Sequence, residues 1–270
     1  MHVLTYHRFR HAPRDPFSVT PEAFARQMAW LAEQRLAISL TRFRQHIEAC
    51  QPLPRDAVLV TIDDGYRDLY THGLPILRRY QIPAVSFVTV GRIEERSGPP
   101  PAHCEDDTHL SWSEVAELAA NGVTVASHGW DHVSLASLDA PQLAFQLRYS
   151  RGELESRLGT AVDAFAYPFG TRRDFGPATE RALADAGYML GFTAQHGAVR
   201  LGANPLALPR VKVEGGEGLW MFRQISRGHL DALGVVDFLF SRIQARGEAD
   251  SVPVRGDLGT DSKAVGYAGD

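Results

Sequence analysis

The stretch that decides the fold of this chain is Ala57-Val58-Leu59-Val60-Thr61-Ile62-Asp63-Asp64-Gly65, an apolar run that stops at two adjacent carboxylates and a glycine. A short β-branched run of this kind is typical of a buried strand. The pattern recurs at Val123-Thr124-Val125-Ala126-Ser127, which is followed by His128-Gly129-Trp130-Asp131-His132. Strands that end in acids and paired histidines indicate a metal-dependent hydrolase on an α/β scaffold.

Similar runs recur along most of the chain and alternate with segments of helical period. This alternation predicts a parallel sheet, and we expect a distorted (β/α) barrel of about seven parallel strands. An open doubly wound sheet is the alternative, but no glycine-rich phosphate loop follows the first run. The expected strands are Val3–Tyr6, Ala57–Ile62, Ala84–Val90, Val123–Ser127, Ala164–Tyr167, Met189–Thr193 and Leu208–Val213.

Helix signals lie between these strands. Thr20-Pro21 pairs a capping residue with proline at the first helical position, and Ser111-Trp112-Ser113-Glu114 has the spacing of a capping box. The second of these helices should end at Asn121-Gly122. Further helices are expected at about 140–158, 177–186 and 230–245. Residues 1–246 should form the folded domain, and 247–270, which are polar and glycine-rich, should form a disordered tail.

Composition excludes several classes of protein. The chain has 28 basic and 32 acidic residues, with no basic cluster interleaved with aromatics, so nucleic acid is not expected as a partner. Two cysteines are too few for a disulfide framework. No apolar run approaches the roughly 18 residues of a membrane span, and no leader precedes the first strand. As written, the protein is expected in the cytoplasm; an N-terminus trimmed of a leader would make it secreted or periplasmic.

Two histidines and two aspartates are the candidate reactive groups. His128 and His132, four residues apart, can face one ion, but Gly129 stands where a zincin glutamate would be. The two histidines make a convincing metal site only together with an acid from another strand. Asp63 and Asp64 can share that site if the strand ends between them, because neighbouring strand residues point to opposite faces. A solvated turn and a glycosidase pair are the alternatives.

These residues carry a resemblance to the polysaccharide deacetylase family (carbohydrate esterase family 4, with the NodB homology domain). Thr61-Ile62-Asp63-Asp64-Gly65 is similar to the first family motif, and Ser127-His128-Gly129-Trp130-Asp131-His132 to the second. The resemblance implies that Asp63 is the catalytic base and that the metal ligands are Asp64, His128 and His132. Zinc is the default ion for such ligands, with nickel, cobalt or iron as alternatives.

The third motif departs from the usual family pattern. Ala166-Tyr167-Pro168-Phe169-Gly170 begins with alanine where the family has an arginine that orients the base. This version resembles the poly-β-1,6-N-acetylglucosamine deacetylase subgroup, which implies that His7, in Tyr6-His7, is the general acid. His196 and His109 are its rivals. We assign the base-orienting role to Arg210, and the resemblance gives the Phe169 backbone N–H the role of binding the oxyanion.

The resemblance implies a metal-dependent hydrolase that removes N-acetyl groups from an amino-sugar glycan or its precursor and releases acetate. Trp130, Tyr167 and Phe169 are candidates for the flat surface on which a sugar ring stacks. Two other functions remain open at this point. One is a non-catalytic carbohydrate-binding module on the same scaffold, and the other is a glycosidase that acts on amino sugars.

Overall fold

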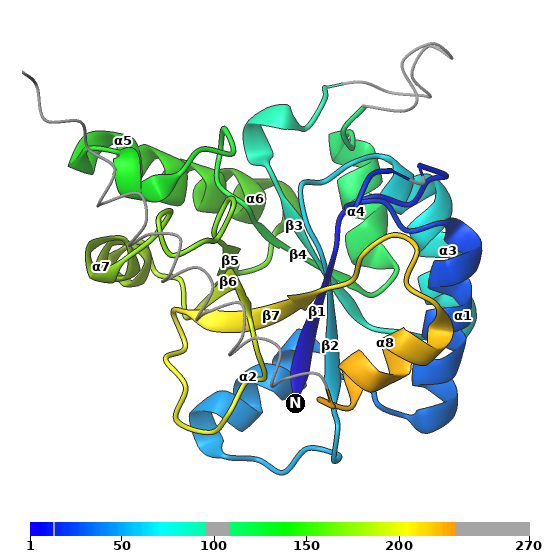
Figure 1. Cartoon of the computed structure of the whole chain (residues 1–270). Coiled ribbons are helices and arrows are strands. Elements are labelled where there is room, and N and C mark those ends of the chain that lie inside the picture. The colour runs from blue at the N-terminus through cyan, green and yellow to red at the C-terminus, as the bar shows by residue number, and fades with distance from the viewer. Residues whose placement is uncertain (13, 96–107, 230–270) are drawn as a thin grey trace, which may run out of the picture. The chain divides into compact units, whose positions relative to one another are not determined.

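Seven parallel strands close into a barrel, and their order around the wall is their order along the chain (Figure 1). The computed structural model describes residues 1–12, 14–95 and 108–229, all within one compact unit. Because β1 pairs with both β2 and β7, the sheet has no free edge. The predicted fold class is therefore confirmed. The strands are β1 (His2–Tyr6), β2 (Val58–Ile62), β3 (Ala84–Val88), β4 (Val123–Ser127), β5 (Ala164–Ala166), β6 (Leu190–His196) and β7 (Leu208–Lys212).

Helices follow most of the strands and cover the outside of the barrel (Figure 1). The α-helices are α1 (Pro21–Gln34), α2 (Leu40–Ala49), α3 (Leu74–Tyr80), α4 (Trp112–Ala120), α5 (Ala140–Ala144), α6 (Ser150–Leu158), α7 (Pro177–Asp185) and α8 (Leu219–Ser226). The described residues also contain two π-helical turns, Leu69–Gly73 and Phe145–Tyr149, and two 3₁₀ turns, Val90–Arg92 and Leu135–Ser137.

Local signals placed the predicted helix starts correctly. Thr20 Oγ1 caps α1 by accepting from Ala23 N at 3.2 Å, and the capping box at Ser111 starts α4. The predicted helix at 140–158 is present as α5 and α6, joined by the π turn Phe145–Tyr149. We did not predict α2, α3 and α8. The expected helix at 230–245 and the expected tail at 247–270 lie outside the described residues.

Alternate side chains of the strands fill the inside of the barrel, as the two-residue period of a strand requires. Helix α2 closes the end of the barrel from which the strands start, since Phe43 packs against Phe192 with ring centroids 5.6 Å apart. The other side chains of the strands face outward and pack against the helices. The interior cluster includes Val3, Leu59, Val85, Phe87, Ala126, Ala164, Ala166, Leu190, Phe192 and Leu208.

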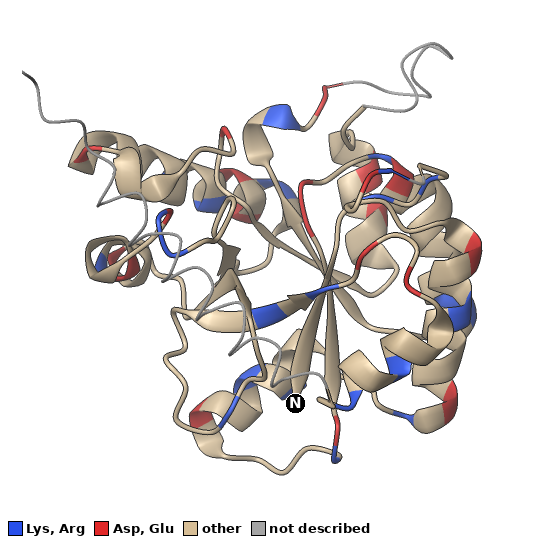
Figure 2. Ribbon diagram, in the orientation of Figure 1, with Lys and Arg blue, Asp and Glu red and all other residues tan. Residues whose placement is uncertain are grey.

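The outer surface is an ordinary solvated one. Basic and acidic residues are interspersed along the ribbon of α1, α3 and α4, with no long stretch of one sign (Figure 2). None of the helices in the described ranges is long and apolar enough to cross a bilayer.

Candidate active site

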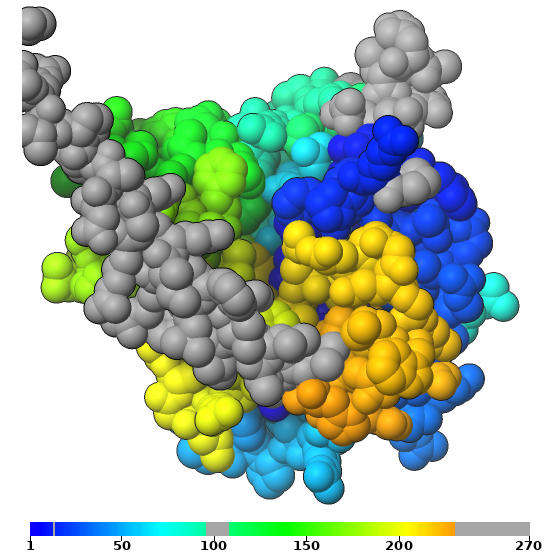
Figure 3. Space-filling view, in the orientation of Figure 1, coloured from blue at the N-terminus to red at the C-terminus, as the bar shows by residue number. Residues whose placement is uncertain are grey.

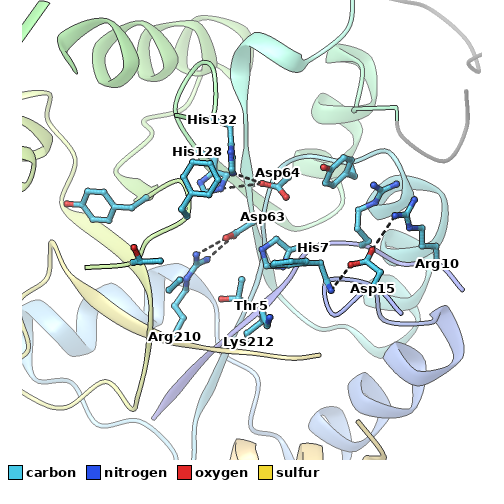
Figure 4. Close-up of a pocket in the computed structure, with 17 residues that line it drawn as sticks. Thr5, His7, Arg10, Asp15, Asp63, Asp64, His128, His132, Arg210 and Lys212 are labelled. Carbon is cyan, nitrogen blue, oxygen red and sulfur yellow. Dashed lines mark hydrogen bonds and ion pairs between the residues drawn. The ribbon is translucent and has the colours of Figure 1, made fainter. Parts of the chain in front are cut away.

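A pocket of about 790 Å3 opens at the carboxyl ends of the strands (Figure 4). Its polar side chains continue the inward-facing series of each strand by one step beyond the packed interior. His7 follows Thr5 on β1, Asp63 follows Thr61 on β2, and His128 follows Ala126 on β4. The alternation that fills the barrel therefore also turns these reactive groups toward one another.

Asp64, His128 and His132 form a cluster in which one atom from each lies within 4.8 Å of the others. Asp64 Oδ1 lies 3.4 Å from His128 Nε2 and 3.2 Å from His132 Nε2. This oxygen is buried, and within the described part of the chain it makes no hydrogen bond. A buried carboxylate oxygen facing two imidazole nitrogens is a site that a cation would complete.

His128 has the tautomer that a metal ligand needs. Its Nδ1 lies 2.7 Å from the carbonyl oxygen of Ala166, and a carbonyl only accepts, so the proton of the neutral ring is on Nδ1. The lone pair of Nε2 then points at Asp64. Burial lowers the pKa of His128, but the carboxylates of Asp64 and Asp63 raise it by more. The surroundings of this ring thus favour positive charge beside it, as a proton or as a metal ion.

Asp63 lies beside this cluster and is paired with Arg210 of β7. Arg210 donates from its two terminal nitrogens to Oδ1 at 2.8 Å and Oδ2 at 2.7 Å, and each side chain is only 3% exposed. Its Nε donates to Thr193 O at 2.8 Å, which fixes the guanidinium. Burial raises the pKa of Asp63, but the charge and hydrogen bonds of Arg210, together with His128 and His7, outweigh burial, and the pKa lies below its usual range. Asp63 is therefore ionised at neutral pH.

The chain turns sharply between the two aspartates. Asp64 has a φ of 73°, in the left-handed region, so it leaves the strand geometry that Asp63 still follows. The next residue, Gly65, has a φ of 76°, and an added Cβ would also crowd Val88 Cβ at 3.2 Å, so glycine is favoured there. His132 and Phe169 also have left-handed φ values, of 59° each. Backbone strain of this kind is common at functional sites, and it persists only where the surrounding packing holds it in place.

Gln146 holds the loop that carries the two histidines. Its Oε1 accepts from the backbone N–H of Trp130 at 2.9 Å and of Asp131 at 3.0 Å, and its Nε2 donates to Asp131 Oδ2 at 2.7 Å. The side chain is 5% exposed and lies in the π turn Phe145–Tyr149. π turns are frequent at functional sites because they redirect side chains. Sequence analysis missed this residue, whose only signal is a glutamine directly before Leu147 on an apolar stripe.

His7 lines the same pocket, on the far side of Asp63 from the histidine pair (Figure 4). Burial lowers the pKa of its imidazole, and the carboxylates of Asp63 and Asp64 do not reverse this effect. His196, a rival for the same role, ends β6, which runs three residues further than predicted. It lines a separate pocket with Arg172 and Arg200. His109 stacks on Tyr66, with ring centroids 4.8 Å apart, and does not line the main pocket.

Of the three predicted sugar-stacking rings, only Phe169 offers an open surface. It is 56% exposed in the pocket and packs edge-on against His132. Its N–H makes no hydrogen bond within the described ranges. Tyr167 also lines the pocket but is 1% exposed, because its ring stacks on Phe175 and its hydroxyl donates to Leu206 O. Little of the Tyr167 ring is therefore open for a sugar to stack on.

Trp130, the third of these rings, packs outside the pocket. Its indole lies against Gly91, where an added Cβ would come within 2.7 Å of Nε1, and against the ring of Phe145. It is not among the residues that line the pocket. Trp130 stands two residues from each histidine of the cluster in sequence, and its backbone N–H donates to Gln146.

Comparison with known proteins agrees with this geometry. The family model described as polysaccharide deacetylase matches residues 51–191, just over half of the chain. A Bacillus subtilis (strain 168) protein named as a polysaccharide deacetylase, YxkH, is 26% identical over 222 residues, which cover 79% of this chain and 71% of that protein. The poly-β-1,6-N-acetyl-D-glucosamine N-deacetylase of Staphylococcus epidermidis is 27% identical over 237 residues, which cover 78% of each chain.

The fold is also that of a solved structure. Streptococcus pyogenes deacetylase PplD in complex with acetate superimposes with a TM-score of 0.75 at 21% identity, over 84% of this chain and 97% of that one. The stretch that matches the family model contains both aspartates, both histidines of the cluster and Phe169, whereas His7 and Arg210 lie outside it. On this match and on the closed barrel that carries these residues, the chain belongs to the polysaccharide deacetylase family.

Proposed function

We propose that this protein hydrolyses the N-acetyl groups of amino-sugar units in a glycan and releases acetate. The observation that carries the proposal is the convergence of two groups of residues. Asp64, His128 and His132 offer three ligand atoms within 4.8 Å of one another, and Asp63, an ionised carboxylate outside that set, directly precedes Asp64 at the end of β2. Ligands and a separate base are what amide hydrolysis at a metal site requires.

The three ligand residues fit a divalent cation. One carboxylate and two imidazoles leave coordination positions for water and substrate, and this donor set favours zinc, with nickel, cobalt or iron also compatible. When bound, such an ion polarises the acetyl carbonyl and lowers the pKa of water toward about 7. Two observations support this assignment independently of the family resemblance. Within the described residues, Asp64 Oδ1 is buried without a hydrogen bond, and His128 carries its proton on Nδ1.

Asp63 is proposed as the general base that accepts the proton of the attacking water. Arg210 holds both of its oxygens, so the carboxylate cannot rotate away, and keeps it ionised at neutral pH. The arginine comes from β7, whereas the usual family arginine would stand at the position of Ala166. A guanidinium delivered from another strand can meet the same requirement, because a bidentate pair fixes geometry and charge together.

His7 is proposed as the general acid that protonates the leaving amine. Since burial lowers its pKa, the protonated ring is a stronger acid than an exposed histidine and gives up its proton more readily. The Phe169 N–H is the proposed donor to the oxyanion, a contribution of about 3–4 kcal/mol for a well-placed group. Its lack of a partner within the described ranges and its place in the pocket support this role.

The alternatives are less well supported. A glycosidase needs one carboxyl group that stays protonated, but the pKa values of Asp63 and Asp64 both lie below the usual range. A non-catalytic binding module would have no reason to keep a buried, paired base beside a complete ligand set.

The names of relatives suggest the first substrate to test. Metal-quantified protein should release acetate from β-1,6-linked N-acetylglucosamine oligomers, chelation should abolish the release, and added zinc should restore it. The matched control is Asp63→Asn, which should retain the metal and lose turnover. Acetate release that withstands chelation and Asp63→Asn, or its absence from every N-acetylated glycan tested, would refute the proposal.

A further inference from the structure

Phe17 is a large apolar side chain that remains 45% exposed inside the pocket, although none of the proposed chemical steps uses it. Two of the large, exposed apolar side chains in the described part of the chain line this pocket, Phe17 and Phe169. The others lie elsewhere on the surface: Tyr149, Met189, Leu201 and Trp220. An exposed aromatic ring in a pocket is a candidate contact for a ligand with an apolar face.

The backbone around Phe17 is held rigidly by Asp15. Asp15 Oδ1 accepts from Phe17 N at 3.0 Å, and Asp15 Oδ2 accepts from Ser18 Oγ at 2.6 Å and from Arg10 at 3.2 Å. Two backbone bonds, Arg8 N to Phe17 O at 3.1 Å and Val19 N to Arg8 O at 2.9 Å, tie this turn to the end of β1. The backbone that carries the ring is thus ordered before any ligand arrives, which reduces the entropy lost on binding.

A second contact supports the same turn, and it comes from the segment that follows the last barrel strand, β7. The segment between β7 and α8 packs on it so closely that a Cβ at Gly215 would lie 2.2 Å from Ser18 O. In the space-filling view, the dark blue N-terminal segment and the yellow segment before α8 lie against each other (Figure 3). The Lys212 ammonium lies 4.5 Å from the centre of the Phe17 ring, and Glu214 accepts from it at 2.7 Å.

The two exposed rings lie on different sides of the reactive groups. Phe17 packs edge-on against His7, with centroids 4.9 Å apart, and comes from the loop after β1. Phe169 packs edge-on against His132, with centroids 4.8 Å apart, and comes from the loop after β5. In the closed barrel β1 has β2 and β7 as neighbours, so β1 and β5 are well separated around the wall. A ligand that contacts both rings must extend across the site.

We propose that Phe17 forms a second sugar subsite, on which the pyranose next to the reacting unit stacks. This inference rests on the proposed function and narrows its substrate class to a glycan of at least two linked units, as opposed to a single activated sugar. The C–H face of a pyranose is apolar and flat enough to cover an aromatic ring, while its hydroxyls can accept from a nearby ammonium such as that of Lys212. Phe169 then contacts the unit that loses its acetyl group.

The test compares substrates of increasing length in Phe17→Ala and wild-type protein. We expect Phe17→Ala to raise KM about tenfold for β-1,6-linked N-acetylglucosamine oligomers of two or more units, with kcat nearly unchanged. For the monomeric methyl glycoside, KM should be the same in both proteins, because that ligand does not reach the ring. Phe17→Trp should restore oligomer affinity, and Phe17→Leu, which keeps apolar bulk without a flat ring, should restore it only in part.

Two controls separate this subsite from other effects. Trp220→Ala removes an exposed aromatic residue outside the pocket and should change neither KM. Binding of the same oligomers, measured by calorimetry on zinc-loaded Asp63→Asn with and without Phe17→Ala, reports on the subsite even if no acetate is released. A Phe17→Ala effect equal for monomer and oligomer, or no effect on oligomer KM and binding, would overturn the subsite. Loss of turnover in wild-type protein with length-dependent binding intact would instead count against the proposed function.

Discussion

The buried pair of Asp63 and Arg210 allows a sharp test of how this site is held together. We consider Arg210→Met, which keeps most of the side-chain volume and removes the charge. In the native protein, both partners are 3% exposed and share two hydrogen bonds, of 2.8 and 2.7 Å. With the guanidinium gone, this almost fully buried carboxylate has lost its counter-charge.

The expected cost follows from that burial. Removing one partner of a buried pair should lower the free energy of unfolding by about 3–5 kcal/mol, because the remaining charge is uncompensated. Asp63→Asn should cost a similar amount for the same reason. In Asp63→Asn/Arg210→Met no buried charge remains, so the double variant should be more stable than the sum of the single effects predicts, by about 2–4 kcal/mol.

The pH dependence of the stability difference between wild type and Arg210→Met should have a definite direction. In the native protein the pKa of Asp63 is lowered, so its contribution is present above the unfolded value of about 3.9 and is lost as pH falls through the folded value. In Arg210→Met, burial without a counter-charge should raise that pKa, and protonation then relieves the cost as pH falls. The gap in stability between wild type and Arg210→Met should therefore narrow from pH 8 to pH 5.

Urea unfolding of all four proteins in the presence of a chelator would measure these quantities without a contribution from metal binding. Arg210→Lys, which keeps the charge but not the bidentate geometry, is the matched control and should fall between wild type and Arg210→Met. Additive single effects, or a gap that stays constant with pH, would show that the pair is not a coupled buried ion pair and would remove Arg210 as the group that orients the base.

Three further predictions concern the metal and the acid. His128→Ala should reduce bound zinc to background by elemental analysis, whereas the exposed His72→Ala should retain it; unchanged zinc in His128→Ala would exclude that residue as a ligand. Gln146→Ala should weaken zinc affinity about 10–100-fold in a competition titration, because the loop carrying both histidines loses three hydrogen bonds, and an unaltered affinity would make Gln146 purely structural. His7→Ala should slow acetate release by a factor of about 10²–10⁴ with zinc stoichiometry intact, and full activity in that variant would assign protonation of the amine to another group.

Much of the barrel could be predicted from the sequence because its signals are local. A short apolar run marks each strand in the sequence, and capping residues mark the helix starts at Thr20 and Ser111. The grouping of Asp64 with His128 and His132 was also within reach, since parallel strands of a barrel present their carboxyl ends at one mouth. Helices α2 and α8 were not predicted from the sequence, because their apolar patterns are short and tertiary packing provides most of their stability.

The order of residues along the chain is enough to place aspartates and histidines at the strand ends, and therefore to say which chemical groups reach the pocket. The contacts that each of these groups makes depend on how the barrel closes and how its loops pack. The sequence suggested Arg210 as the partner of Asp63, 147 positions away, but the two-bond geometry of the pair comes from the fold, as does the contact of Gln146 with its loop through a π turn. Trp130 faces away from the pocket and Phe17 faces into it, because barrel closure and loop packing set the direction of these side chains. Neither direction can be predicted from a local sequence pattern.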